Sequence, residues 1–141
     1  MSKSSLVFIL FIFVACTTTD NQSFKPKQNK AVSQLIIEAS QAIRNENTKL
    51  AQSHLQRALR ISPKDAEIYY LLAKVQWKEK AYSDALGLLD RSFSYVGNYK
   101  KLEQKIWVLR SVVYDSLNMP KKSNSALEKA DAIELILNPK K

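Results

Sequence analysis

The fold of this 141-residue chain is decided by two short stretches, Ala66-Glu67-Ile68-Tyr69-Tyr70-Leu71-Leu72-Ala73 and Tyr82-Ser83-Asp84-Ala85-Leu86, the second of which is followed by Leu89. Apolar residues recur in both stretches at helical spacing, and an alanine stands among the larger side chains of each. Small side chains at such positions allow the backbones of two antiparallel helices to approach closely. The two stretches therefore predict a helical hairpin.

The same pattern occurs twice more in the chain, at a spacing of about 34 residues. An earlier copy begins at Val32, and a later copy begins at Gln104, after a slip of four residues. The three copies are residues 32–65, 66–99 and 104–137. One hairpin of this kind cannot bury its apolar face alone, so about three stacked copies are needed for a stable core.

These positions resemble the signature of the tetratricopeptide repeat family. In the middle copy Tyr69 stands at the tryptophan position, Leu72-Ala73 at the Leu-Gly pair, and Ala85 at the small residue where the two helices cross. The matching residues of the other copies are Leu35, Ala39, Ala51, Leu55, Ala58 and Pro63, and Trp107, Ser111, Tyr114, Ser123, Leu127 and Ala130. The resemblance covers Val32 to Leu137 and implies an all-α, antiparallel helix-hairpin solenoid of about three repeats.

The connection between the second and third copies departs from the family pattern, because no proline closes the second copy. The four extra residues are expected to lengthen either the connection 96–101 or the first helix of the third copy. Pro120 is expected at the start of the last helix, where its missing N–H costs nothing, and residues 138–141 are expected to form a tail.

The composition excludes several kinds of functional site. The chain has two glycines, one cysteine and one histidine, which argues against glycine-rich phosphate loops, internal disulfides and multi-ligand zinc sites. His54 is interpreted as a partly exposed helix residue, and the acidic pairs Asp65/Glu67 and Asp84/Asp90 as helix caps or solvated faces. We expect a non-enzymatic protein with no catalytic residue, no metal site and no cofactor.

The N-terminus, residues 1–15, has the pattern of a signal peptide. Lys3 precedes an unbroken run of ten apolar residues from Leu6 to Ala15. A membrane-spanning helix needs about 20 such residues, whereas about 7 to 15 suit the core of a signal peptide. The alternative is a buried strand or helix of the mature fold, although such segments seldom start with a cation and stay wholly apolar.

The segment Phe13-Val14-Ala15-Cys16 resembles the lipobox of bacterial lipoproteins. The resemblance implies cleavage before Cys16, a diacylglyceryl group on its thiol, and a fatty acid such as palmitate on the new amine. Ala15 is the favoured small residue, whereas Phe13 replaces the usual leucine. Two or more acyl chains hold a protein stably on a membrane. The alternative is that Cys16 is a structural thiol.

Residues 16–31 are expected to form the lipidated cysteine and a flexible tether, because they are polar and have no apolar period. In lipoproteins of Gram-negative bacteria an aspartate after the cysteine retains the protein in the inner membrane. Thr17 occupies that position here, so the resemblance implies the periplasmic face of the outer membrane.

Tetratricopeptide arrays bind peptides or helices in the concave surface that the first helix of each repeat lines. The inner-facing positions are Ser33, Ile36, Ser40 and Ile43 in copy one, Glu67, Tyr70, Lys74 and Trp77 in copy two, and Lys105, Val108, Val112 and Asp115 in copy three. Tyr70 and Trp77 flank Lys74 at helical spacing, and aromatic side chains with cations are typical of binding hot spots. The alternative is that Trp77 packs against a neighbouring helix. The carboxylate clamp of chaperone-binding members is rejected, since only Lys105 matches it.

The net charge of +9 comes from scattered Lys and Arg. Its simplest role is solubility, and a competing role is docking on acidic phospholipid, lipopolysaccharide or an acidic partner. An exported, tethered protein is not expected to meet nucleic acid.

The last helix is expected to be more apolar than one underlying repeat can cover. Its apolar residues are Ala132, Ile133, Leu135, Ile136 and Leu137. Exposed apolar patches commonly mark interaction sites, so we expect this end to dock against a second copy or a partner subunit. The alternative is that the helix folds back over repeat two.

Together these patterns predict a membrane-anchored, periplasm-facing lipoprotein that acts as a protein–protein interaction adaptor in cell-envelope assembly. Analogy at the level of the fold points to small lipoproteins that escort pilus or secretin components or recruit cell-wall hydrolases. The alternative is an envelope-binding structural lipoprotein whose basic surface meets anionic lipid or polymer.

Overall fold

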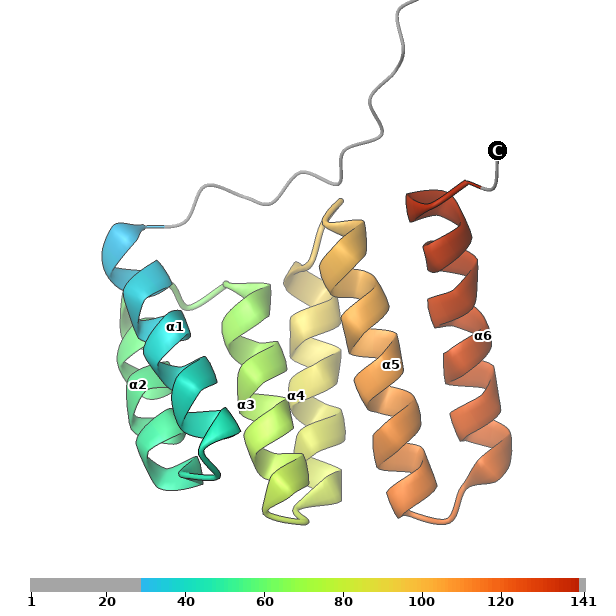
Figure 1. Ribbon diagram of the computed structural model, residues 1–141, viewed down its shortest axis with the longest axis horizontal. Coiled ribbons are helices and arrows are strands. Elements are labelled where there is room, and N and C mark those ends of the chain that lie inside the picture. The colour runs from blue at the N-terminus through green and yellow to red at the C-terminus, as the bar shows by residue number, and fades with distance from the viewer. Residues whose placement is uncertain (1–28, 140–141) are drawn as a thin grey trace, which may run out of the picture.

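Six helices form the regular secondary structure of residues 29–139, the part of the chain that this computed structural model describes. They are α1 (Lys30–Arg44), α2 (Thr48–Ile61), α3 (Ala66–Lys78), α4 (Tyr82–Tyr95), α5 (Lys100–Ser116) and α6 (Pro120–Leu137). Consecutive helices pair as three antiparallel hairpins, which lie side by side in chain order (Figure 1). The expected all-α hairpin solenoid is confirmed.

Each hairpin turns through one residue in the left-handed region of the backbone. These residues are Glu46 (φ 59°), Lys80 (φ 62°) and Asn118 (φ 56°). The backbone N–H of the residue that follows each of them donates to a carbonyl five residues back, at 2.9 Å in all three turns. This arrangement satisfies a carbonyl at the end of the first helix. The three turns follow the spacing of the predicted copies, including the slip of four residues.

The first helices of the first two hairpins begin at polar caps. The side-chain oxygens of Asn29 and Asp65 each accept the backbone N–H two residues ahead at 2.9 Å. Such caps satisfy backbone donors that have no partner inside the helix. α1 begins at Lys30, two residues before the predicted start of the first repeat, so residues 30 and 31 belong to the helix and the predicted tether 16–31 was too long at this end.

The four extra residues of the third repeat lengthen its first helix rather than the connection. The connections 62–65 and 96–99 have the same length, and α3 begins at Ala66, the first position of its repeat. α5 instead begins at Lys100, one helical turn before Gln104. Pro120 occupies the first turn of α6, as expected.

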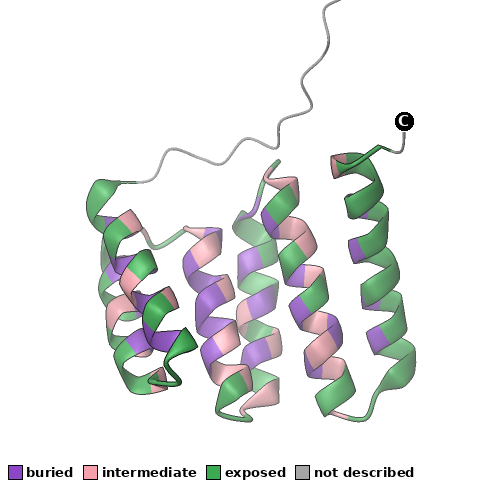
Figure 2. Cartoon of the chain, in the orientation of Figure 1, coloured by how far each residue is buried: buried purple, intermediate pink, exposed green. Residues whose placement is uncertain are grey.

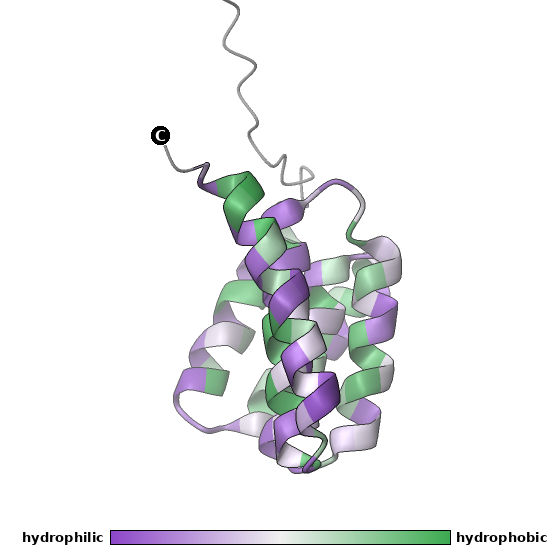
Figure 3. Ribbon diagram, turned by 90° about the vertical axis from the view of Figure 1, so that its right-hand side faces the viewer, coloured by the Kyte–Doolittle hydropathy of each residue, from purple (hydrophilic) through white to green (hydrophobic). Residues whose placement is uncertain are grey.

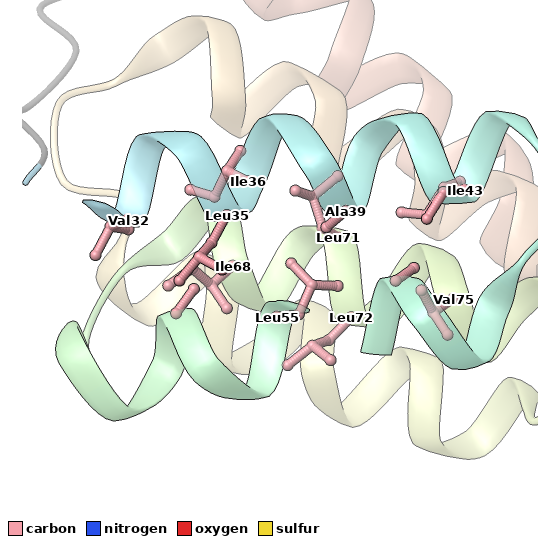
Figure 4. Packing of buried hydrophobic residues seen from close by; sticks show 13 residues of the cluster. Val32, Leu35, Ile36, Ala39, Ile43, Leu55, Ile68, Leu71, Leu72 and Val75 are labelled. Atoms are coloured by element: carbon pink, nitrogen blue, oxygen red, sulfur yellow. The ribbon is translucent and has the colours of Figure 1, made fainter. Parts of the chain in front are cut away.

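The core consists of two clusters of buried side chains that follow the hairpins. The first joins α1, α2 and α3 and includes Leu55 and Ile68, and Figure 4 shows its side chains between these helices. The second joins α3, α4 and α5 and includes Leu89 and Ile106. The small residues predicted at the crossings are buried: Ala39, Ala51, Ala73, Ala85, Ser111 and Ser123.

α6 packs against α5 and against no other helix of the described chain. The alternative that this helix folds back over repeat two is therefore wrong. Ile133 is buried against α5, whereas Leu135 and Ile136 are 58% and 52% exposed. Figure 2 shows that most of α6 is exposed, and Figure 3 shows an apolar end at its C-terminal turn.

The predicted signal peptide, Cys16 and the tether up to residue 28 lie outside the described residues. Within residues 29–139, none of the helices combines the length and the apolar character needed to cross a bilayer.

Candidate protein-interaction surface

The predicted inner-facing residues stand on α1, α3 and α5, the first helices of the three hairpins. α1 contacts α3, and α3 contacts α5, so these helices form one continuous layer. Residues at the same repeat position differ greatly in exposure along this layer. At position five, Ile36 is 6% exposed, Tyr70 is half-buried and Val108 is 42% exposed.

The exposure differs because the neighbouring helices cover this position to a different extent in each hairpin. Ile36 and Ile43 lie in the first core cluster together with Leu71 and Val75 of α3. These isoleucines were predicted to face the groove, and their burial under the second hairpin corrects that prediction. Val108 has no following hairpin in the described chain and remains open to solvent. The accessible part of the inner layer is therefore on α5.

Trp77 packs between the second and third hairpins. Its side chain is half-buried against the second core cluster, and its indole N–H donates to Ser116 Oγ of α5 at 3.2 Å. The structure thus agrees with the alternative that this tryptophan contacts a neighbouring helix, and part of the ring remains exposed.

Tyr70 occupies the boundary of the two core clusters and contacts both. Burial raises the pKa of its phenol, and the negative charge of Glu67, one turn earlier, raises that pKa further. Burial disfavours the phenolate because the charged form loses its hydration. Tyr70 therefore contributes mostly to packing, and a smaller part of it faces solvent.

The remaining predicted residues divide between the two helices. Glu67 and Lys74 on α3 and Val112 on α5 are half-buried, whereas Lys105 is exposed beside Val108 on α5. The layer therefore offers an apolar strip, Val108 and Val112, with Lys105 at one end and the exposed Asp115 at the other. Such a strip could bind the apolar or acidic face of a peptide or helix.

The single histidine lies next to a carboxylate. His54 Nδ1 lies 3.1 Å from Glu38 Oε2, a carboxylate on α1 that the sequence spacing around His54 did not reveal. Across residues 29–139 there is no group of three His, Cys, Asp or Glu side chains that could hold a metal ion.

The sequence interpretation missed a basic hollow on the other side of α5, next to α6. Two short runs at helical spacing contribute to it, Trp107-Arg110-Tyr114 on α5 and Lys122-Ser125-Lys129 on α6. Each run was visible in the sequence. Their convergence depends on how α6 lies along α5, which the repeat pattern does not give.

Residues 42–106 match the model of the tetratricopeptide repeat family. The match runs from the end of α1 to the first half of α5 and so includes the whole second hairpin. It supports the family resemblance and indicates a role in protein–protein interaction. Neither the comparison with curated proteins nor the comparison with solved structures found a match.

Proposed function

We propose that this chain is a membrane-anchored, periplasm-facing lipoprotein that serves as a non-enzymatic adaptor in assembly of the bacterial cell envelope. The observation that carries the adaptor role is the stack of hairpins whose last inner helix, α5, leaves Val108 and Lys105 open to solvent. Tetratricopeptide domains are interaction scaffolds, and such a surface is the place where they take a partner. The anchor is supported by the placement of Cys16 directly after the apolar run.

The proposed partner contacts α5 first and then the exposed parts of Lys74 and Trp77 on α3. Val108 supplies apolar area at the centre of this surface, and the two lysines select for a partner with acidic groups nearby. A secretin or pilus component, or a cell-wall hydrolase, is the kind of client that the fold-level analogy suggests. A second copy or a partner subunit is proposed to cover the apolar end of α6.

The anchor is tested by expressing the full chain in a bacterium with an alkyne analogue of palmitate. The native chain should incorporate the label and lose residues 1–15. Cys16→Ser should remain unlabelled and uncleaved at this site, whereas the matched control Thr17→Ser should behave like the native chain. Maturation of Cys16→Ser at the same site, with partition into detergent, would contradict the anchor.

The adaptor role is tested by cross-linking in the cell envelope and purification of the full chain. A discrete stoichiometric partner should be recovered with the native protein. Val108→Glu should reduce its yield about tenfold, because a carboxylate replaces apolar contact area at the centre of the surface and would have to lose hydration when the partner binds. The control Leu50→Glu replaces a similarly exposed residue on α2 and should retain the partner.

Circular dichroism of both variants should match the native protein, because Val108 and Leu50 are exposed. The alternative, an envelope-binding structural lipoprotein, expects a different result. Salt-labile binding to anionic vesicles, without any discrete protein partner, would contradict the adaptor role and favour that alternative.

A further inference from the structure

A hollow of about 300 Å³ lies between α5 and α6, at helical positions of α5 on the other side from Val108 and Val112. Its volume is at the small end of the range for ligand pockets. Aromatic and cationic side chains dominate its lining: Trp107, Tyr114, Arg110, Lys121, Lys122 and Lys129. The pocket therefore differs in chemistry from both core clusters.

Three of the cations lie over the aromatic rings of this pocket. Lys129 Nζ is 4.2 Å from the centroid of the Trp107 ring, and the Arg110 guanidinium carbon is 5.1 Å from the same centroid. Lys122 Nζ is 5.6 Å from the centroid of Tyr114. Cation–π attraction acts within about 6 Å of a ring. These contacts hold the positive charges of two helices around one space before any ligand arrives.

The positive charge of the pocket is largely uncompensated. Asp90 Oδ1 accepts a hydrogen bond from Arg110 Nη2 at 2.7 Å. In the described part of the chain, no carboxylate lies within ion-pair distance of Lys121, Lys122 or Lys129. Four cations thus face one carboxylate, and an anion in the hollow would reduce their mutual repulsion.

The start of α6 adds to this imbalance. α6 has no side-chain cap at its N-terminus and no acidic residue in its first turn, where Lys121 and Lys122 stand instead. The N-terminal end of a helix carries a partial positive charge, so acidic residues are favoured there and cations are unfavourable. Two lysines in this turn cost stability unless a negative group lies close to them.

We propose that this hollow binds a phosphate group. Lysine ammonium groups and an arginine guanidinium form strong charge-assisted hydrogen bonds with phosphate oxygens, and Ser125 supplies a hydroxyl at the same wall. The small volume and the convergence of cations from two helices suit a single, highly charged group better than an extended acidic peptide. The group comes from the headgroup of an anionic phospholipid or from free phosphate. The inference depends neither on the anchor nor on a partner at α5.

Isothermal titration of the full chain in a non-ionic detergent tests the proposal with three probes. The probes are inorganic phosphate, dihexanoyl phosphatidylglycerol and a hexaglutamate peptide. The native protein should bind the phosphate probes saturably. Lys122→Gln/Lys129→Gln should weaken this binding about tenfold or more, because two charge-assisted contacts are lost. Lys122→Arg/Lys129→Arg should retain most of it.

The matched control Lys49→Gln/Lys64→Gln removes the same charge from exposed positions in and after α2 and should change the affinity less than about twofold. Much tighter binding of the phospholipid than of inorganic phosphate identifies a headgroup as the source, and equal binding identifies free phosphate. Absence of saturable binding to both phosphate probes, or an equal loss in the control, overturns the proposal. So does hexaglutamate binding that requires Lys122 and Lys129 while phosphate does not bind.

Discussion

At the scale of single residues, position in the stack decides what a side chain does. Tyr70 shows this clearly, because the sequence assigned it to a binding groove and the structure places it at the boundary of two core clusters. Burial and the nearby charge of Glu67 make ionisation of its phenol unfavourable. The same position in the first repeat carries Ile36, which needs no polar partner and is fully packed.

The raised pKa of Tyr70 predicts a loss of stability at high pH. The unfolded chain deprotonates this tyrosine near pH 10, whereas the folded protein keeps its proton to a higher pH. The stabilising contribution is therefore complete below pH 10 and decreases as the pH rises through the folded-state pKa. Tyr70→Phe should remove this part of the decrease in the free energy of unfolding, measured by urea unfolding between pH 8 and 11.5.

A control for this prediction is Tyr95→Phe, which removes the hydroxyl of an exposed tyrosine of α4. This variant should keep the decrease at high pH that the native protein shows. If Tyr70→Phe and Tyr95→Phe give the same pH dependence, burial of Tyr70 is not the cause.

At the scale of the helices, a few polar contacts fix the position of one helix relative to its neighbour. Ser92 of α4 is fully buried, and its Oγ donates to the backbone carbonyl of Ala66, the first residue of α3, at 2.7 Å. The indole of Trp77 joins α3 to α5 in a similar way through Ser116. Each contact ties one end of a helix to its neighbour and so sets the position of one helix along the other.

Removal of the buried hydroxyl should destabilise the second hairpin. We expect Ser92→Ala to lower the free energy of unfolding by about 1 kcal/mol more than Ser94→Ala does, measured by urea unfolding. Ser94 is a good control because its hydroxyl is exposed and bonds only within α4, to the carbonyl of Asp90. Both substitutions gain the same helix propensity, so their difference isolates the bond to Ala66. Equal stabilities of the two variants would show that this bond contributes nothing.

At the scale of the whole molecule, the ends of the stack differ from its middle. Among the described helices, the middle hairpin has a neighbour on either side, whereas α6 packs against α5 alone. Solenoids usually finish with a polar outer face, because a terminal repeat otherwise exposes the surface meant for the next one. Leu135 and Ile136, in the last turn of α6, remain exposed. Self-association is therefore expected at this end of α6.

Sedimentation velocity of residues 29–141, which lack the proposed anchor site, tests this expectation. The native sequence should shift from monomer toward dimer as its concentration rises. Ile136→Lys should abolish the shift, because a lysine ammonium on the covered patch would lose its hydration. The control variant Leu50→Lys changes an exposed residue on α2, and this variant should still associate. A strict monomer at millimolar concentration, unaffected by Ile136→Lys, would contradict self-association.

The sequence by itself determined the number of hairpins, their order and the residues at their crossings. The reason is that these features are local. Apolar spacing defines each helix, and small residues such as Ala39, Ala73 and Ala85 mark the places where backbones approach closely. The slip of four residues was also visible, although it fitted a longer connection as well as a longer helix, and the structure assigns it to α5.

Only the tertiary structure decided which repeat positions are accessible and which charges meet. Ile36, Tyr70 and Val108 share one repeat position, and their exposure depends on how far the neighbouring helices cover each of them, which no local pattern records. The basic hollow needs Trp107 of α5 to lie beside Lys129 of α6, and this depends on how far one helix is shifted along the other. Side-chain packing across the whole interface between α5 and α6 sets that shift. The repeat pattern therefore predicted the helices but not the surface along which α5 and α6 pack.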